Sequence, residues 1–178
     1  MFENLKKAWQ LIRKNYWLSL GVDAGSLIFV FLVITGWQNR ELLPVNVDNL
    51  APDFVLRDLE GQPYSLQQTR GRETLLYFFS PSCHICNLSA HNLEAIRRAR
   101  RQDELAIYLV AIGWQNVDEV REFAERHQLT IPVLLGNAGI SQEYRILVTP
   151  TYYVLDTEGR VRGRSVGYSS ELGLRWRT

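Results

Sequence analysis

The chain has 178 residues, a mass of 20.6 kDa and a formal net charge of +1. This length suits one ordinary domain with an appendage, while 46 % hydrophobic and 22 % charged residues exclude a disordered or collagen-like chain. Two cysteines are too few for a disulfide-stapled scaffold, and a charge near zero argues against a dedicated nucleic-acid binder.

The first predicted element is an apolar segment from Trp17 to Trp37, whose length of about 21 residues matches the ~20 needed to cross a hydrocarbon core. Aromatic residues stand at both ends, as at membrane interfaces, and cations dominate residues 1–16. The positive-inside rule then places the N-terminus in the cytoplasm. We therefore expect a cytoplasmic basic segment at 1–16, a transmembrane signal anchor at 17–37, and the remaining chain outside a bacterial cytoplasmic membrane or a thylakoid membrane.

Two other interpretations of this segment stay open. Its densest apolar part, Leu27 to Ile34, is short enough for the core of a cleaved signal peptide, and a helix buried in a soluble domain is the third alternative. Asp23 is costly inside a bilayer unless it reaches the cytoplasmic headgroups or contacts another membrane helix. The flanking aromatic residues and cations favour the uncleaved anchor.

The rest of the chain is interpreted as a linker at 38–50 and one domain at 51–178. Apolar runs of strand length, separated by turn residues, predict strands over 54–56, 64–66, 74–79, 105–112, 132–135, 151–155 and 161–166. Amphipathic spacing and a cap at Ser82 predict helices over 84–98 and 117–127. A short helix or turn is expected over 139–145, and the start of a last helix over 171–176. Strands that alternate with helices and finish in a hairpin predict an α/β sandwich with a mixed sheet.

The chemistry of the sequence is concentrated at Cys83-His84-Ile85-Cys86, which follows the strand predicted at 74–79 and opens the next helix. At a helix N-terminus, unpaired N–H groups and the macrodipole stabilise the thiolate of the first cysteine. The second cysteine lies one turn further on, close enough to form a disulfide with the first. This arrangement predicts a redox-active dithiol.

Other uses of the two cysteines are less well supported. A structural zinc ion needs four ligands, whereas beyond the cysteines the chain offers only three histidines, one of them inside the motif. Covalent haem attachment needs a histidine where Asn87 stands, and a structural disulfide across so short a loop stabilises little. We therefore expect neither a metal nor a cofactor.

Three stretches resemble a known family. Ala-Pro-Asp-Phe at 51–54 is similar to the opening of the membrane-anchored thioredoxin-like proteins of the TlpA/ResA type and of the AhpC/TSA redoxin group. Residues 78–86 resemble their active-site strand and loop, and Ser-Pro-Ser-Cys is also similar to the MauD-like maturation proteins. Val-Thr-Pro-Thr at 148–151 resembles the cis-proline loop that faces the dithiol. The resemblance implies a thioredoxin-like α/β mixed-sheet sandwich.

The resemblance also implies a thiol–disulfide oxidoreductase, which acts on protein dithiols or disulfides and exchanges electrons with a transmembrane donor or acceptor. Cys83 would be the attacking thiolate, and Cys86 the thiol that resolves the mixed disulfide. Pro150, in the cis form, would keep its neighbour's backbone groups free, and Thr149 would pair with an extended substrate. His84 would lower the pKa of Cys83. The direction of electron flow is left open.

The sequence departs from the family pattern around the dithiol. It has Ser82 for the usual tryptophan, Ile85 for the usual proline, Tyr77 for the buried aspartate of thioredoxin, and Ser89 for a glutamate of cytochrome maturation proteins. A peroxiredoxin-like peroxidase is a competing interpretation, but Leu76 stands where its motif needs a proline. The alternative from another class is a non-catalytic assembly or maturation factor for a metalloprotein or cytochrome.

Overall fold

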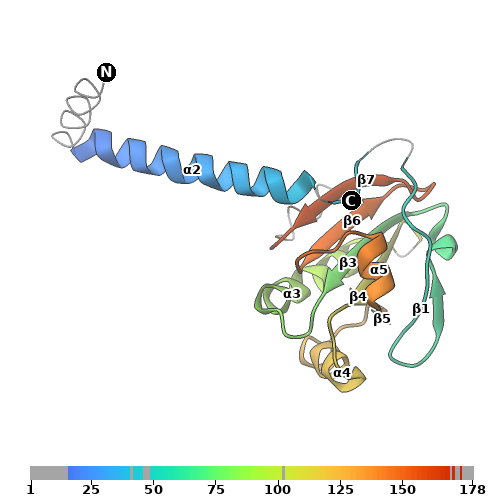
Figure 1. Cartoon of the computed structure of the whole chain (residues 1–178). Coiled ribbons are helices and arrows are strands. Elements are labelled where there is room, and N and C mark those ends of the chain that lie inside the picture. Colours follow the sequence, from blue (N-terminus) through green and yellow to red (C-terminus); the bar gives the residue numbers. More distant parts are fainter. Residues whose placement is uncertain are drawn as a thin grey trace. The chain divides into compact units, whose positions relative to one another are not determined.

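The computed structural model describes residues 16–40, 42–45, 49–101, 103–168, 170 and 173 of the chain (Figure 1). The chain divides into two compact units, 1–38 and 39–178. Helix α2 (Tyr16–Arg40) accounts for the described part of the first unit. Its side chains are described from 20 to 33, and all of them are exposed.

Helix α2 includes the segment 17–37, for which a transmembrane anchor is predicted. Among the residues that the structure describes, however, no helix is both long and apolar enough to span a bilayer. The predicted anchor is therefore not confirmed. The basic segment predicted at 1–16 lies, apart from Tyr16, outside the described residues.

The second unit is built on a five-stranded sheet in the order β5-β4-β3-β6-β7. Its strands are β3 (Glu73–Phe79), β4 (Leu105–Ala111), β5 (Val133–Leu135), β6 (Thr151–Leu155) and β7 (Val161–Val166). Strands β3, β4 and β5 pair in parallel, whereas β6 runs antiparallel to both β3 and β7. The predicted mixed sheet is confirmed, and its central strands are almost entirely buried, as their continuous apolar runs require.

A small hairpin precedes this sheet. Strands β1 (Val55–Arg57) and β2 (Pro63–Ser65) pair antiparallel around a turn in which Gly61 has a φ of 81°, a left-handed conformation that favours glycine. The strand predicted at 64–66 ends at Ser65, because a short 3-10 helix, η1 (Leu66–Thr69), begins there. The Ser65 side chain accepts the Gln67 N–H and so caps this helix.

The described residues of the second unit include the α-helices α3 (His84–Ala99), α4 (Val117–Arg126) and α5 (Ala138–Glu143). The cap of α3 is Cys83 and not the predicted Ser82, because the Cys83 sulfur accepts the backbone N–H of Cys86. The helix predicted at 171–176 lies outside the described residues, apart from Gly173.

The core has two parts, one on each face of the sheet. Alternate β3 side chains, including Tyr77 and Phe79, pack with α3 and α4, while Leu76 and Phe78 pack with α5 on the other face. This alternation follows from the two-residue period of a strand. The result is a sheet between two helical layers (Figure 1).

Two residues from the predicted linker, Leu42 and Leu43, are buried in the second unit. The Arg164 guanidinium donates to the carbonyls of both residues. The Leu43 N–H donates to the Tyr153 hydroxyl at 3.2 Å, and that hydroxyl donates onward to the Tyr144 carbonyl at 2.7 Å. The folded unit therefore begins several residues before the family-like segment at 51.

Candidate active site

The two cysteines lie where strand β3 gives way to helix α3. Strand β3 ends at Phe79, which is fully buried, and the Cys83 N–H then donates to the Ser80 carbonyl at 3.0 Å in a tight turn. Both cysteines are free thiols, with Cys83 half-buried and Cys86 fully buried. Only the first thiol is therefore open to a partner molecule.

The surroundings of Cys83 favour its thiolate. Its sulfur accepts the Cys86 N–H at 3.2 Å, a bond that favours the thiolate, and in the thiol form it donates to the Thr149 carbonyl at 3.4 Å. Burial alone would raise the pKa of the Cys83 thiol, but hydrogen bonds from the Cys86 and Thr149 side chains and from the first-turn backbone outweigh it, so the pKa is lowered. The start of α3 thus supplies the stabilisation expected at a helix N-terminus.

The surroundings of Cys86 favour its neutral form. Burial, and after it the hydrogen bond with the Cys83 side chain, raise the pKa of the Cys86 thiol to about 12. The pair therefore holds one thiol that ionises more readily than an ordinary thiol and one that stays protonated near neutral pH. This asymmetry fits an attacking and a resolving cysteine.

The predicted cis-proline loop lies beside the dithiol. The Thr149–Pro150 peptide bond is cis, and the Thr149 carbonyl faces the Cys83 sulfur across 66 positions of the sequence. The loop is held by the Thr151 hydroxyl, which donates to the Val148 carbonyl at 2.8 Å, and by the Gly167 N–H, which donates to the Pro150 carbonyl at 2.8 Å. The structure thus brings the predicted residues Cys83, Thr149 and Pro150 together.

His84 is placed differently from these residues. It is the first residue of α3, and its side chain is exposed. The groups that lower the pKa of Cys83 belong to Cys86, Thr149 and Ile85. Tuning of the thiol by His84 therefore stays a prediction.

Tyr77 and Ser89, two departures from the family pattern, lie next to Cys86. The Tyr77 hydroxyl is buried without a hydrogen bond of normal geometry to any residue that the structure describes. Burial raises the pKa of Tyr77, and the charge of Cys86 raises it further. The Ser89 hydroxyl donates to the Ile85 carbonyl at 2.9 Å. Neither Tyr77 nor Ser89 has a carboxylate, so neither replaces the buried aspartate of thioredoxin as a proton acceptor.

Two residues near the dithiol were not singled out as functional from the sequence. The Asn87 side chain donates from Nδ2 to the Cys83 carbonyl at 2.9 Å, and its Oδ1 lies 2.9 Å from His127 Nε2. Position 87 is one helical turn after Cys83, a spacing that permits the first contact. No local pattern indicates the second contact, since the two residues are 40 positions apart.

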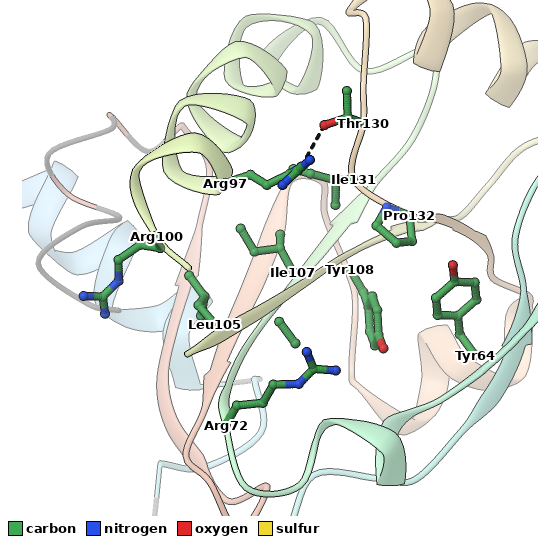
Figure 2. Close-up of a pocket in the computed structure, with 11 residues that line it drawn as sticks. Tyr64, Arg72, Arg97, Arg100, Leu105, Ile107, Tyr108, Thr130, Ile131 and Pro132 are labelled. Carbon is green, nitrogen blue, oxygen red and sulfur yellow. Dashed lines mark hydrogen bonds between the residues drawn. The ribbon is translucent and has the colours of Figure 1, made fainter. Parts of the chain in front are cut away.

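A cavity of about 180 Å³ lies at the opposite end of β3 and β4 (Figure 2). Its lining includes Arg72, Arg97 and Tyr108, and Figure 2 shows Arg97 bonded to the Thr130 hydroxyl, at 2.7 Å. Cys83 does not line it. Within the described part of the chain, no cluster of three or more His, Cys, Asp or Glu side chains is arranged to hold a metal ion.

The sheet order, the dithiol at the head of α3 and the facing cis-proline define a thioredoxin-like thiol–disulfide oxidoreductase. Solved structures share this fold. A putative thiol:disulfide interchange protein DsbE from Chlorobium tepidum aligns with a TM-score of 0.68 at 18 % identity, over 75 % of this chain and 96 % of that chain. StoA from Bacillus subtilis aligns with a TM-score of 0.63 at 22 % identity, over 75 % of this chain and 98 % of that chain.

Residues 47–164 match the AhpC/TSA family, and the chain belongs to this family. The thioredoxin-like protein YneN of Bacillus subtilis is 31 % identical over 81 % of this chain and 88 % of its own length. The thiol-disulfide oxidoreductase ResA of Geobacillus thermodenitrificans is 30 % identical over 68 % and 70 %, and the methylamine utilization protein MauD of Paracoccus denitrificans is 27 % identical over 71 % and 62 %. The resemblances expected from the sequence are thus confirmed, and the chain is a thiol–disulfide oxidoreductase.

Proposed function

We propose that Cys83 and Cys86 carry the oxidoreductase activity as a redox pair. The Cys83 thiolate attacks a disulfide in a protein substrate, forms a mixed disulfide and releases one substrate thiolate, which takes up a proton. Cys86 then loses its proton and attacks the Cys83 sulfur, which releases the second substrate thiol. The substrate gains two electrons and two protons while the cysteines form a disulfide, and the reverse sequence oxidises a dithiol.

The observation that carries this proposal is the contrast between the two thiols. Cys83 is half-buried, and its pKa is lowered, whereas Cys86 is fully buried, and its pKa is raised to about 12. A thiol that is both reachable and acidic makes the first attack. A protonated, enclosed thiol one turn away acts only on a disulfide already formed at Cys83.

The substrate we propose is an extended segment of a protein. Apolar side chains next to the dithiol are exposed: Ile85 at 39 % and Leu88 at 56 % on α3, and Leu147 at 72 % and Val148 at 44 % before the cis-proline. Exposed apolar side chains of this kind favour contact with another macromolecule. The Thr149 backbone at this edge would pair with the extended substrate.

Disulfide reduction by the purified full chain tests the redox pair. We expect the wild-type protein to catalyse reduction of insulin by dithiothreitol, and Cys83→Ser to abolish the catalysis. Cys86→Ser should instead accumulate a mixed disulfide that a reductant releases. Full turnover by Cys83→Ser would show that the pair does not carry the activity.

The direction of electron flow is tested by the potential of the pair, equilibrated against glutathione. A value well below about −250 mV would indicate a reductant that draws on a transmembrane donor, and one near −120 mV an oxidant that passes electrons to an acceptor.

We further propose that α2 anchors the chain in a bacterial cytoplasmic or thylakoid membrane, with the N-terminus cytoplasmic and the dithiol on the other side. Apolar residues fill positions 27–33 consecutively, and all of these side chains are exposed. Seven consecutive residues cover the whole circumference of about two helical turns, a distribution that favours an apolar environment over water.

Cell fractionation tests this anchor. We expect alkaline carbonate to leave the full chain in the membrane fraction. A membrane-impermeant maleimide should label the Cys86→Ser variant, whose single remaining thiol is Cys83, in intact cells. Release by carbonate, or protection of Cys83 until the cells are opened, would contradict the proposed anchor and orientation.

A further inference from the structure

The side chain of Asn87 joins the backbone of Cys83 to the end of helix α4. Its Nδ2 donates to the Cys83 carbonyl at 2.9 Å. Its Oδ1 lies 2.9 Å from His127 Nε2 and accepts from Arg126 Nη1 at 3.4 Å. One amide therefore connects the residue at the head of α3 with two residues at the end of α4.

The hydrogen bonds of this network have a defined direction. The Cys83 carbonyl can only accept, so the amide of Asn87 must turn its Nδ2 toward it and its Oδ1 toward α4. The amide oxygen of Asn87 can only accept, so His127 Nε2 must carry the proton. Donation therefore runs from His127 through Asn87 to Cys83.

The far end of the network is held by the core. The ring centroids of His127 and Phe123 lie 4.6 Å apart, and those of Phe123 and Phe79 lie 4.5 Å apart. Phe79 is the last residue of β3. Burial lowers the pKa of His127, and the charge of Arg126 lowers it further. His127 Nε2 donates in either charge state, so the bond to Asn87 does not depend on protonation.

We propose that Asn87 is a positioning residue for the attacking thiol, and that His127 holds it in that role. The Cys83 carbonyl accepts both the Asn87 N–H, at 3.2 Å, and the Asn87 side chain. These two bonds fix the backbone of the cap residue, and through it the sulfur that accepts the Cys86 N–H. The inference rests on the proposed function only in that it takes Cys83 as the attacking cysteine.

Replacement of Asn87 by leucine tests the first link, because leucine has a similar size and no amide. We expect the thiolate fraction of Cys83 at a fixed pH below its pKa to fall about threefold to tenfold, the effect of losing the Cys86 N–H bond to the sulfur that Asn87 positions. The disulfide then becomes less oxidising by about 15 to 30 mV. Asn92→Ala, on the same helix and bonded to Tyr168, is the control and should leave both quantities unchanged.

His127, which is also half-buried, supplies a second test. His127→Leu removes the donor and should lower the thiolate fraction in the same direction. His127→Gln offers an amide N–H at a similar reach and should restore it. This rescue separates the hydrogen bond from a general loss of packing.

The measurement is the ultraviolet absorbance of the thiolate against pH, with the disulfide potential as a second readout. Wild-type thiolate fractions in both folded Asn87→Leu and His127→Leu would overturn the positioning role. Failure of the wild-type chain to reduce a disulfide would instead contradict the proposed function, and the absorbance titration would still decide the role of Asn87.

Discussion

Cys83 and Cys86 are three positions apart in sequence but differ in exposure and acidity. Cys83 is the N-cap of α3 and is half-buried, whereas Cys86 is fully buried and packs in the core on one face of the sheet. Their pKa values move in opposite directions because hydrogen bonds outweigh burial at the first thiol, while burial dominates at the second.

Alkylation of the reduced chain tests this asymmetry. The rate at which Cys83 reacts with iodoacetamide should rise with pH. Because the pKa of Cys83 is lowered, this rate should reach half of its maximum at a lower pH than the rate of an ordinary thiol does. Cys86, with a pKa of about 12, should stay unmodified near neutral pH. Mass spectrometry of the folded protein should find one modified cysteine, at position 83. Equal modification of both cysteines would contradict the assignment.

His84 allows a prediction about tuning. A cationic imidazole at the head of α3 would stabilise the neighbouring thiolate, so His84→Ala should raise the pKa of Cys83. The side chain is exposed, and solvent and salt screen its charge, so the change should shrink at high ionic strength. Absorbance titrations at low and high salt measure it, with His91→Ala, an exposed histidine on the same helix, as the control. An unchanged titration at low salt would remove the tuning role.

Sequence reasoning found the residues that belong to local motifs. The C-x-x-C spacing and the Thr-Pro pair each identify a short segment, and the structure brings these segments together. The sequence does not predict the contact between Asn87 and His127, because it joins two helices that are far apart in the chain and no local pattern indicates it. The sequence predicts Ser82 as the N-cap of α3, one residue too early. In the structure the Cys83 sulfur, and not the Ser82 hydroxyl, accepts a backbone N–H of the first turn.

At the scale of elements, a buried carboxylate holds α3 to the segment before β5. Glu94 is 3 % exposed and accepts the N–H groups of Thr130, at 2.6 Å, and Ile131, at 3.2 Å, together with the Thr130 hydroxyl at 3.0 Å. These bonds compensate the burial of a charged group and tie the helix to the loop.

Replacement of Glu94 by alanine should therefore destabilise the fold. It leaves two backbone N–H groups without their acceptor, and we expect a loss of about 3 kcal/mol in the free energy of unfolding. Urea denaturation measures this loss. Glu122→Ala, at an exposed position of α4, should change it by less than about 0.5 kcal/mol. A loss for Glu94→Ala no larger than for Glu122→Ala would show that the carboxylate contributes nothing.

The elements themselves were largely predictable. Continuous apolar runs gave β3 and β4, because strands buried on both faces have no polar alternation. The 3-10 helix η1 was missed, since a short helix leaves too few residues for a periodic signal. The sheet order could not be read from any single segment, because it depends on pairing between strands far apart in sequence.

At the scale of the whole molecule, the folded unit starts earlier than its family-like sequence. Leu42 and Leu43 are 3 % and 7 % exposed, and Arg164 and Tyr153 bind their backbone. A stretch without a clear period looks like a linker in the sequence, because two adjacent leucines carry no strand or helix pattern.

Two shortened chains test this boundary. A chain that starts at Asn39 keeps both leucines and should unfold with the stability of the second unit in the full protein. A chain that starts at Ala51 loses them, and we expect its free energy of unfolding to fall by about 3 kcal/mol, from lost apolar burial. Urea denaturation compares the two. Equal stability would contradict a structural role for Leu42 and Leu43.

The two edge strands of the sheet, β7 and β5, affect whether the domain can pair with a strand of another molecule. At one edge, β7 carries Arg162, which pairs with Glu73, and Arg164, and its register with β6 shifts between Val154 and Leu155. At the other edge, β5 is only three residues long and meets Asp58 in an isolated bridge. Charged side chains, irregular register and short strands all disfavour pairing with a strand of another molecule. Both described edges of the sheet therefore disfavour edge-to-edge aggregation of the domain.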